Sequence, residues 1–403
     1  MTTHTADHTD VRATNLAAVL RFLRAEAPCS RAAIATGTGL NKATVTSIVG
    51  DLIGRRLVRE TEQTQNHVGR PATLLVLDGS SYAAIGMEIS ARGLTAIAYD
   101  AAGDQLLRWH RSGPAADAGP AKAIAALAAL ARRAVTAVHS SGRDVLGLTV
   151  GVPGLINYEG TVVLAAGLGW RDVELGKDLV QALGRPAFPV LVDNDANLGA
   201  LAEHRYGPHT GSTNLIHLTG DTGVGAGVIC DGRPLRGHLG YVGEIGHLQI
   251  TPDGPLCGCG RHGCLEAVAG VPAILARLDP AGLPDADPQV GTEQLVRRAE
   301  AGETGTLEVL SEAGTMLGRG VSVLANILNP ELIVLGGSYA ALGRWLLPAI
   351  EKELADDALA PEAGGCQVVT STFGHDATAI GAVARSLDSL DSGRLPAVSA
   401  LRS

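Results

Sequence analysis

Three cysteines fall within a span of eight residues that is dense in glycine. Cys257, Cys259 and Cys264 stand in the run Cys-Gly-Cys-Gly-Arg-His-Gly-Cys, and the nearest histidines are His247 and His262. Three thiolates and one imidazole form the tetrahedral ligand set that zinc prefers, with no position left for a water molecule. The spacing therefore predicts a structural Zn²⁺ site whose fourth ligand is one of these histidines. The alternative is a set of free thiols on a glycine-rich turn.

Two further segments have the residues of a ligand-binding cleft. An apolar run at 145–150 leads into Gly151-Val152-Pro153-Gly154, and another at 190–192 leads into Asp193-Asn194-Asp195. We interpret both runs as buried strands, together with 83–89 and 94–99. Because α/β folds place ligands at the carboxyl ends of their strands, the two segments predict a cleft at that edge.

The N-terminal residues have the pattern of a helix-turn-helix. Apolar spacing predicts a helix over 12–24, and Ser30 predicts the cap of a second helix that ends near residue 36. Gly37 and Gly39 predict the tight turn, and Asn41 predicts the cap of a third helix. The third helix buries one apolar side, formed by Val45, Ile48, Val49 and Leu52.

Small polar residues lie on the opposite side of that third helix. Such residues near a helix N-terminus are suited to base edges and phosphates in a major groove of DNA. The candidates are Asn41, Lys42, Ala43, Thr44, Thr46 and Ser47.

A hairpin is expected after the third helix. Residues 57–60 and 72–77 are interpreted as its two strands, joined by a polar loop that ends His67-Val68-Gly69-Arg70-Pro71. This hairpin would be the wing of a winged helix, with Arg70 at its tip facing a minor groove or a phosphate. Helix-turn-helix geometry has no unique sequence, so a dimerisation or protein-binding module is the alternative to a DNA reader.

The charge distribution agrees with a DNA contact confined to this first unit. The 403-residue chain has a formal net charge of -9, which argues against a protein generally coated by nucleic acid. Residues 1–80, however, hold nine Lys or Arg and seven Asp or Glu. The net charge of residues 1–80 is therefore positive, whereas that of the rest of the chain is negative, and this favours DNA binding by the first unit.

We expect the protein to reside in the cytoplasm. The longest Ala-rich stretch, residues 121–138, is interrupted by Lys122, Arg132 and Arg133, and residues 1–10 are polar without a basic start. Three of the six cysteines are clustered, as in metal sites of reducing compartments. The others, Cys29, Cys230 and Cys366, are interpreted as small buried apolar residues.

The segments 218–247 and 257–266 resemble the signature of the ROK family (repressors, open reading frames, kinases). The order of the whole chain resembles the sugar-responsive repressors of this family. The resemblance implies a winged helix-turn-helix over 1–80 followed by an actin-like, ribonuclease-H-like body of two α/β lobes with a sugar cleft between them. Lobe I would span 81–205, with 375–403 returning to it, and lobe II would span 206–374 with the zinc.

The resemblance also implies site residues. The family's Glu-x-Gly-His pattern selects His247 as the fourth zinc ligand, and His262 becomes an exposed loop residue. Five positions match the carbohydrate ligands of ROK kinases, and the loop at Gly154 is expected to border the same pocket. The five are Asn194, Asp195, Glu244, His247 and Glu266.

The same resemblance raises the alternative that the protein is a sugar kinase. In ROK kinases Asp195 would be the general base, and those kinases open the body with Asp-x-Gly-Gly-Thr-Lys or a close variant. This chain has Glu88-Ile89-Ser90-Ala91-Arg92-Gly93, which puts side chains where phosphate needs bare backbone. The segments 222–227 and 335–338 remain rich in glycine, so the alternative is an ATP-dependent sugar kinase that carries an N-terminal helix-turn-helix.

We therefore expect a regulator of the repressor type rather than an enzyme. Its expected partners are double-stranded operator DNA, a small sugar or sugar phosphate, and a second copy of itself in a homodimer or a dimer of dimers. No membrane contact is expected. An effector that is a phosphosugar or another protein is the third alternative.

Overall fold

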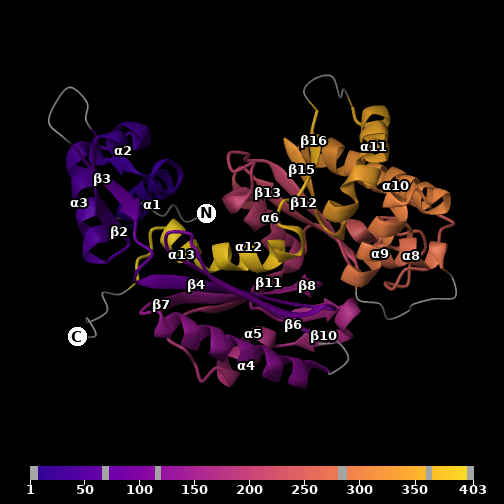
Figure 1. The fold of residues 1–403 in the computed structure, drawn as a ribbon, viewed down its shortest axis with the longest axis horizontal. Helices are drawn as coiled ribbons and strands as arrows, with labels where there is room; N and C mark the ends of the chain where they lie inside the picture. The colour runs from indigo at the N-terminus through magenta and orange to yellow at the C-terminus, as the bar shows by residue number, and fades with distance from the viewer. Residues whose placement is uncertain (1–7, 66–71, 114–118, 280–287, 360–364, 397–403) are drawn as a thin grey trace.

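The computed structural model describes residues 8–65, 72–113, 119–279, 288–359 and 365–396. A separate N-terminal unit stands at the left of Figure 1, beside a larger body. Its sheet has the order β1-β3-β2. The elements of this unit are α1 (His8–Glu26), β1 (Cys29–Ser30), α2 (Arg31–Thr38), α3 (Lys42–Gly54), β2 (Val58–Gln65) and β3 (Ala72–Leu77).

The expected helix caps are present in this unit. Ser30 accepts a hydrogen bond from the backbone N–H of Ala33, and Asn41 accepts one from that of Thr44. The prediction for Gly37 was wrong, since it lies inside α2 and only Gly39, at φ 70°, makes the turn. Gly37 serves packing instead, because a Cβ there would lie 2.0 Å from the ring of Phe22.

The first lobe of the body is a five-stranded sheet in the order β11-β7-β4-β5-β6. The first three strands in sequence are antiparallel neighbours, and β7 and β11 join in parallel. Figure 1 shows α4 below this sheet and α12 above it. The elements of this lobe are β4 (Tyr82–Ser90), β5 (Gly93–Asp100), β6 (Gln105–Ser112), α4 (Gly119–Ser140), β7 (Asp144–Val152), α5 (Leu175–Ala182), β11 (Val190–Asn194) and α6 (Asp195–Tyr206).

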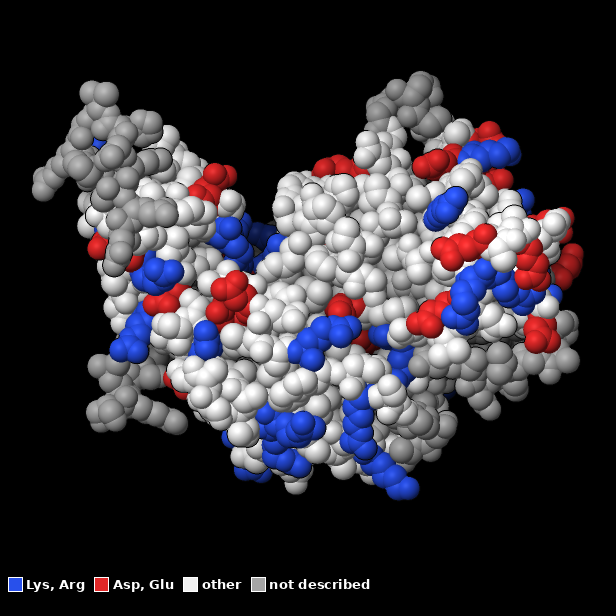
Figure 2. Space-filling model, in the orientation of Figure 1, with Lys and Arg blue, Asp and Glu red and all other residues white. Residues whose placement is uncertain are grey.

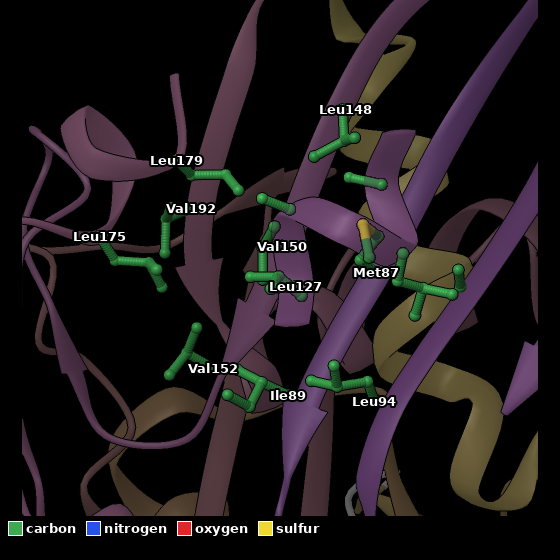
Figure 3. Packing of buried hydrophobic residues seen from close by; sticks show 14 of the residues in the cluster. Met87, Ile89, Leu94, Leu127, Leu148, Val150, Val152, Leu175, Leu179 and Val192 are labelled. Carbon is green, nitrogen blue, oxygen red and sulfur yellow. The ribbon is translucent and has the colours of Figure 1, made fainter. Parts of the chain in front are cut away.

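Strand β4 is apolar on both faces because both are covered. Met87 and Ile89 pack with Leu127 of α4 and with Val150 in the cluster that Figure 3 shows. On the other face Gly86 lets α12 approach closely, since a Cβ there would lie 2.0 Å from the carbonyl oxygen of Ala379. Such a two-sided core explains why this strand lacks the alternation of a half-exposed strand.

A second sheet, in the order β14-β13-β12-β15-β16, forms the other lobe. It is covered by helices at the right of Figure 1. Its elements are β12 (Leu215–Gly220), β13 (Val224–Cys230), β14 (Arg233–Pro234), η2 (Ile245–His247), α7 (Leu265–Ala269), α8 (Val271–Leu278), α9 (Pro288–Glu300), α10 (Thr304–Leu328), β15 (Leu332–Gly337), α11 (Ser338–Asp357) and β16 (Gln367–Thr370).

The chain then returns to the first sheet. After η4 (Gly374–Asp376), helix α12 (Ala377–Ser386) packs on β4, β7 and α6, and α13 (Asp388–Asp391) contacts α1 of the N-terminal unit. A small sheet of β8 (Leu155–Ile156), β9 (Val162–Ala165) and β10 (Trp170–Val173) follows β7, with η1 (Ala166–Leu168) between its last two strands. The expected fold class is confirmed: a winged helix precedes two α/β lobes. No described helix is long and apolar enough to span a membrane.

Candidate functional site

The four expected metal ligands lie together. One ligand atom from each of His247, Cys257, Cys259 and Cys264 falls within 4.8 Å of the others. The Sγ of Cys257 is 3.7 Å from Nδ1 of His247, and the Sγ atoms of Cys259 and Cys264 are 3.7 Å apart. A tetrahedron with Zn–S bonds of about 2.3 Å has edges of about 3.8 Å. The donor set therefore fits zinc in both chemistry and size.

The loop that carries the thiols is held by its own backbone. The N–H of Cys257 donates to the carbonyl of Arg261, and Gly263 packs so tightly that a Cβ would lie 1.5 Å from Thr251 O. Hydrogen bonds from Arg261 lower the pKa of Cys259 to about 6, whereas burial raises the pKa of Cys257 and of Cys264. His262 is exposed and its Nδ1 lies 3.1 Å from the carbonyl of Gly254, outside the group.

The isolated cysteines follow expectation in part. Cys29 is buried and Cys366 is half-buried, but Cys230, at the end of β13, is exposed. The prediction of a buried Cys230 was wrong because the strand reaches the surface before its last residue.

Glu266 lies directly against the metal group. Its Oε2 accepts a hydrogen bond from Val224 N at 3.0 Å, and its Oε1 lies 3.7 Å from the Sγ of Cys257. A Cβ on Gly223 would lie 2.7 Å from the same carboxylate, so a larger residue there would displace the Glu266 side chain. Glu244, three residues before His247, is exposed and faces His247 and Glu266 closely enough to interact with both charges.

Asn194 and Asp195 stand where β11 ends and α6 begins. Asn194 caps α6 by accepting from Asn197 N at 3.0 Å, and its Nδ2 donates to the carbonyl of Gly154 at 3.0 Å. The parallel pairing of β11 with β7 brings these two predicted loops together. The pKa of Asp195 is raised to about 6, mainly by burial and also by the charges of Asp221 and Glu244. Asp195 and Glu244, from the two lobes, therefore lie close enough to interact electrostatically.

A buried charged cluster lies beside Asp195. Arg92 is 7% exposed, its guanidinium is 3.6 Å from Glu88, and it donates to the carbonyl of His375 at 3.2 Å. Asp221 lies 3.4 Å from His375. The remaining cavity among these side chains measures about 30 Å³, room for about one or two waters.

Sequence reasoning missed Asp221 and His375 altogether. They are 154 residues apart: Asp221 follows β12, and His375 lies in η4, after the last strand of the second lobe. His375 belongs to no motif, and Asp221 lies in the segment 218–247 without any sign of its partner, so only the folded chain shows that they meet.

The cluster predicts a pH dependence of stability. Burial raises the pKa of Glu88 to about 7, and Asp221 and Asp195 add to the effect against the attraction of Arg92. Between the two pKa values the folded chain keeps a proton on Glu88 that the unfolded chain has released. Proton binding to Glu88 therefore stabilises the folded state at low pH, and this stabilisation is lost as pH rises from about 5 to about 8.

We expect Glu88→Gln, which does not titrate, to become more stable relative to wild type across that pH range. Urea unfolding at four pH values measures this difference. The exposed Glu308→Gln is the control, and a difference that stays flat with pH would contradict the assignment.

The face proposed to read DNA is accessible. Five of the candidates are exposed and Thr44 is half-buried; the exposed ones are Asn41, Lys42, Ala43, Thr46 and Ser47. Asn41 already uses its side-chain oxygen as the cap, and Thr46 donates to Lys42 O. Arg70 lies outside the described residues. Figure 2 shows both signs of charge on this unit, so charge alone does not mark the DNA face.

A chain of ion pairs connects the winged helix with the body. Arg24 of α1 pairs with Asp391 at 2.7 Å, and Arg205 of α6 pairs with both Asp391 and Asp388. Arg385 joins Asp388 to the buried Asp193.

This series of ion pairs ends on the second lobe, where Arg236 pairs with the same Asp193. Asp193 immediately precedes Asn194 and Asp195. Contiguous contacts therefore run from the N-terminal unit to the edge of the candidate cleft.

Comparison with known proteins agrees with this organisation. The chain is 31% identical over 376 residues to the xylose repressor of Bacillus spizizenii, covering 93% of this chain and 95% of that protein. It is 36% identical over 256 residues to a glucokinase of Halalkalibacterium halodurans, covering 60% of this chain and 76% of the enzyme. A crystal structure of a ROK family transcriptional regulator, described as a homologue of the Escherichia coli MLC protein, superimposes with a TM-score of 0.79 at 27% identity over 96% of this chain and 98% of the other. The sequence profile of the ROK family matches residues 84–388, and the chain belongs to this family.

Proposed function

We propose that the protein is a sugar-responsive, DNA-binding transcription regulator of the repressor type, acting on genes of carbohydrate metabolism in the cytoplasm. The observation that carries the proposal is a winged helix joined to a ROK body, an organisation that matches a xylose repressor over 93% of this chain and 95% of that protein. We divide the chain into a DNA-binding unit (1–80), a first lobe (81–205 with 375–403) and a second lobe (206–374).

On this proposal α3 enters a major groove. Its N-terminal face presents Lys42 to phosphate and the small residues Ala43 and Ser47 to base edges. The wing, with Arg70 at its tip, reaches the neighbouring minor groove. Two copies of the chain, related by a two-fold axis, would bind a roughly palindromic operator.

Zinc holds the second lobe's side of the sugar pocket in place. Four protein ligands complete its coordination, so the metal supplies rigidity and no water activation. His247 offers Nδ1 to this group, which leaves Nε2 for a sugar hydroxyl. Glu266 sits two residues after Cys264, so loss of the metal would displace a sugar ligand as well.

The sugar is held by paired acceptors and donors from both lobes. Asp195 and the Gly154–Asn194 pair lie on the first lobe, and Glu244, His247 and Glu266 lie on the second. A ligand that contacts both sides favours one arrangement of the lobes. If it prefers that arrangement by about 2 to 3 kcal/mol, operator affinity changes about 30- to 150-fold.

The second candidate is an ATP-dependent sugar kinase, favoured by the presence of Asp195 in a partly desolvated site with its pKa near 6. Against it stands the buried Arg92 side chain, which with Glu88 leaves about 30 Å³ where a phosphate loop would have to open. We expect the purified protein to consume no ATP above background with any sugar of a hexose and pentose panel. A coupled ADP assay measures this, and sugar-dependent turnover would favour the kinase.

Mapping of bound DNA across the source genome tests the regulator directly. We expect a small number of palindromic sites next to genes for uptake or breakdown of one sugar, and those genes name the effector. Binding spread evenly over the genome would contradict sequence-specific regulation.

A further inference from the structure

A second cavity lies away from the candidate sugar cleft. It measures about 440 Å³, within the range of small-molecule sites, and lies along β11 and α5 of the first lobe. Lys177 and Arg185 line it from the first lobe, Arg385 lines it from α12, and Arg236 reaches it from the second lobe. None of the sugar candidates lines this cavity.

The cavity is basic. Four cationic side chains face it, and Glu159 is the only carboxylate among its lining residues. Lys177 is paired with Glu174, whereas Arg185 is exposed and makes no ion pair with any described residue. The remaining two cations, Arg236 and Arg385, both pair with the buried Asp193 outside the lining, and Arg385 pairs with Asp388 as well.

Arg236 is fixed in place with unused hydrogen-bonding capacity. Its guanidinium lies 5.2 Å from the centre of the Tyr158 ring and one Nη pairs with Asp193. Its Nε is buried and has no hydrogen-bond partner among the residues that the structure describes. A buried donor without a partner is costly, so this arginine has one hydrogen-bonding group that the described residues do not satisfy.

We propose that this cavity binds a small phosphate monoester, such as a phosphorylated metabolite, as a second ligand distinct from the sugar. Guanidinium groups bind phosphate oxygens through paired charge-assisted hydrogen bonds, and the cavity presents three arginines and one lysine to such an anion. The apolar edge strand at 190–192 and the Tyr158 ring would contact the carbon skeleton.

Occupancy of this site would act on the ion-pair chain described above. A phosphate competes with Asp193 for Arg236 and Arg385, and Arg385 also holds Asp388. Through Arg205 and Asp391 the same contacts reach Arg24 of α1, so a bound phosphate would alter how the winged helix is held. This consequence for DNA rests on the proposed function, whereas the binding site itself does not.

Calorimetric titration of the full-length protein without DNA tests the site, with inorganic phosphate and glucose 6-phosphate as probes. We expect saturable binding that Arg185→Gln and Arg236→Gln each weaken about ten- to a hundredfold, the cost of one charge-assisted hydrogen bond. Arg171→Gln, an exposed arginine of β10 outside the cavity, is the matched control and should leave binding unchanged. Thermal unfolding checks that each variant is folded, and the exposed Arg185 keeps the test valid if Arg236→Gln does not fold.

Two results would overturn the proposal. Binding that survives both arginine variants but is lost in Asp195→Asn would place the phosphate in the sugar cleft. No saturable binding of either probe to the wild-type protein would show that the cavity has no affinity for phosphate. Because DNA is absent from every titration, failure here leaves the regulator itself standing.

Discussion

Replacing Ser47 with glutamate is expected to abolish specific DNA binding, with a loss of at least about a hundredfold in affinity. Ser47 is exposed on the N-terminal half of α3, and the new carboxylate would stand against phosphates and base edges without a counter-charge. A misplaced like charge in such an interface costs several kcal/mol, which exceeds the roughly 2.7 kcal/mol of a hundredfold loss. Fluorescence anisotropy with a mapped operator fragment measures the effect.

The matched control is Thr136→Glu, which adds the same charge to an exposed position of α4 below the first sheet (Figure 1). It should bind the operator as wild type does. Sugar binding by Ser47→Glu should also be unchanged, because α3 has no part in the pocket. An operator affinity of Ser47→Glu within a fewfold of wild type would refute the placement of α3 in the groove.

The second large effect is expected from the metal. Cys264→Ser should reduce bound zinc from about one ion per chain to a small fraction, since serine is a poor zinc ligand beside thiolates. Sugar affinity should fall at least about ten- to a hundredfold, because Glu266 and His247 depend on the same loop for their positions. Plasma emission spectrometry measures the zinc, and calorimetry measures the sugar.

Cys230→Ser is the control, since Cys230 is exposed and outside the metal group. It should keep both zinc and sugar affinity. A Cys264→Ser protein that has lost its zinc yet binds sugar normally would separate the metal from the pocket and contradict its proposed role.

Local features of the fold were predictable from the sequence because they depend on near neighbours. Ser30 and Asn41 cap helices by hydrogen bonds three residues along the chain, and the apolar runs at 83–89 and 190–192 became β4 and β11. The three cysteine ligands were also predictable, since their spacing is selective, whereas the choice of His247 over His262 came from the resemblance to the ROK family.

Features that depend on distant neighbours were missed. The two-residue strand β1 exists only because Cys29 and Ser30 pair with Leu75 and Leu74, and Gly37 is explained by the ring of Phe22. Residues near the C-terminus gave no sign that Asp388 and Asp391 would pair with arginines from α1 and α6. Such pairings are set by packing between elements, which local propensity does not encode.

The candidate pocket shows the same division. The resemblance to the ROK family indicated the carboxylates of the pocket by position. Residue types alone could not show that the Arg92 side chain fills the space beside Asp195. A glycine-poor turn between β4 and β5 suggested that phosphate would be excluded, but the structure adds the buried Glu88–Arg92 pair and the His375 carbonyl that hold the side chain there.

We propose that one chain binds duplex DNA sequence-specifically and that its affinity for this DNA changes when a sugar binds. The most direct measurement is operator affinity of the purified protein with and without the sugar that its mapped target genes indicate. The proposal predicts tight binding to that fragment over random duplex and a change of about thirtyfold or more on adding the sugar. A protein that prefers no duplex fragment, yet consumes ATP when given a hexose, would contradict it.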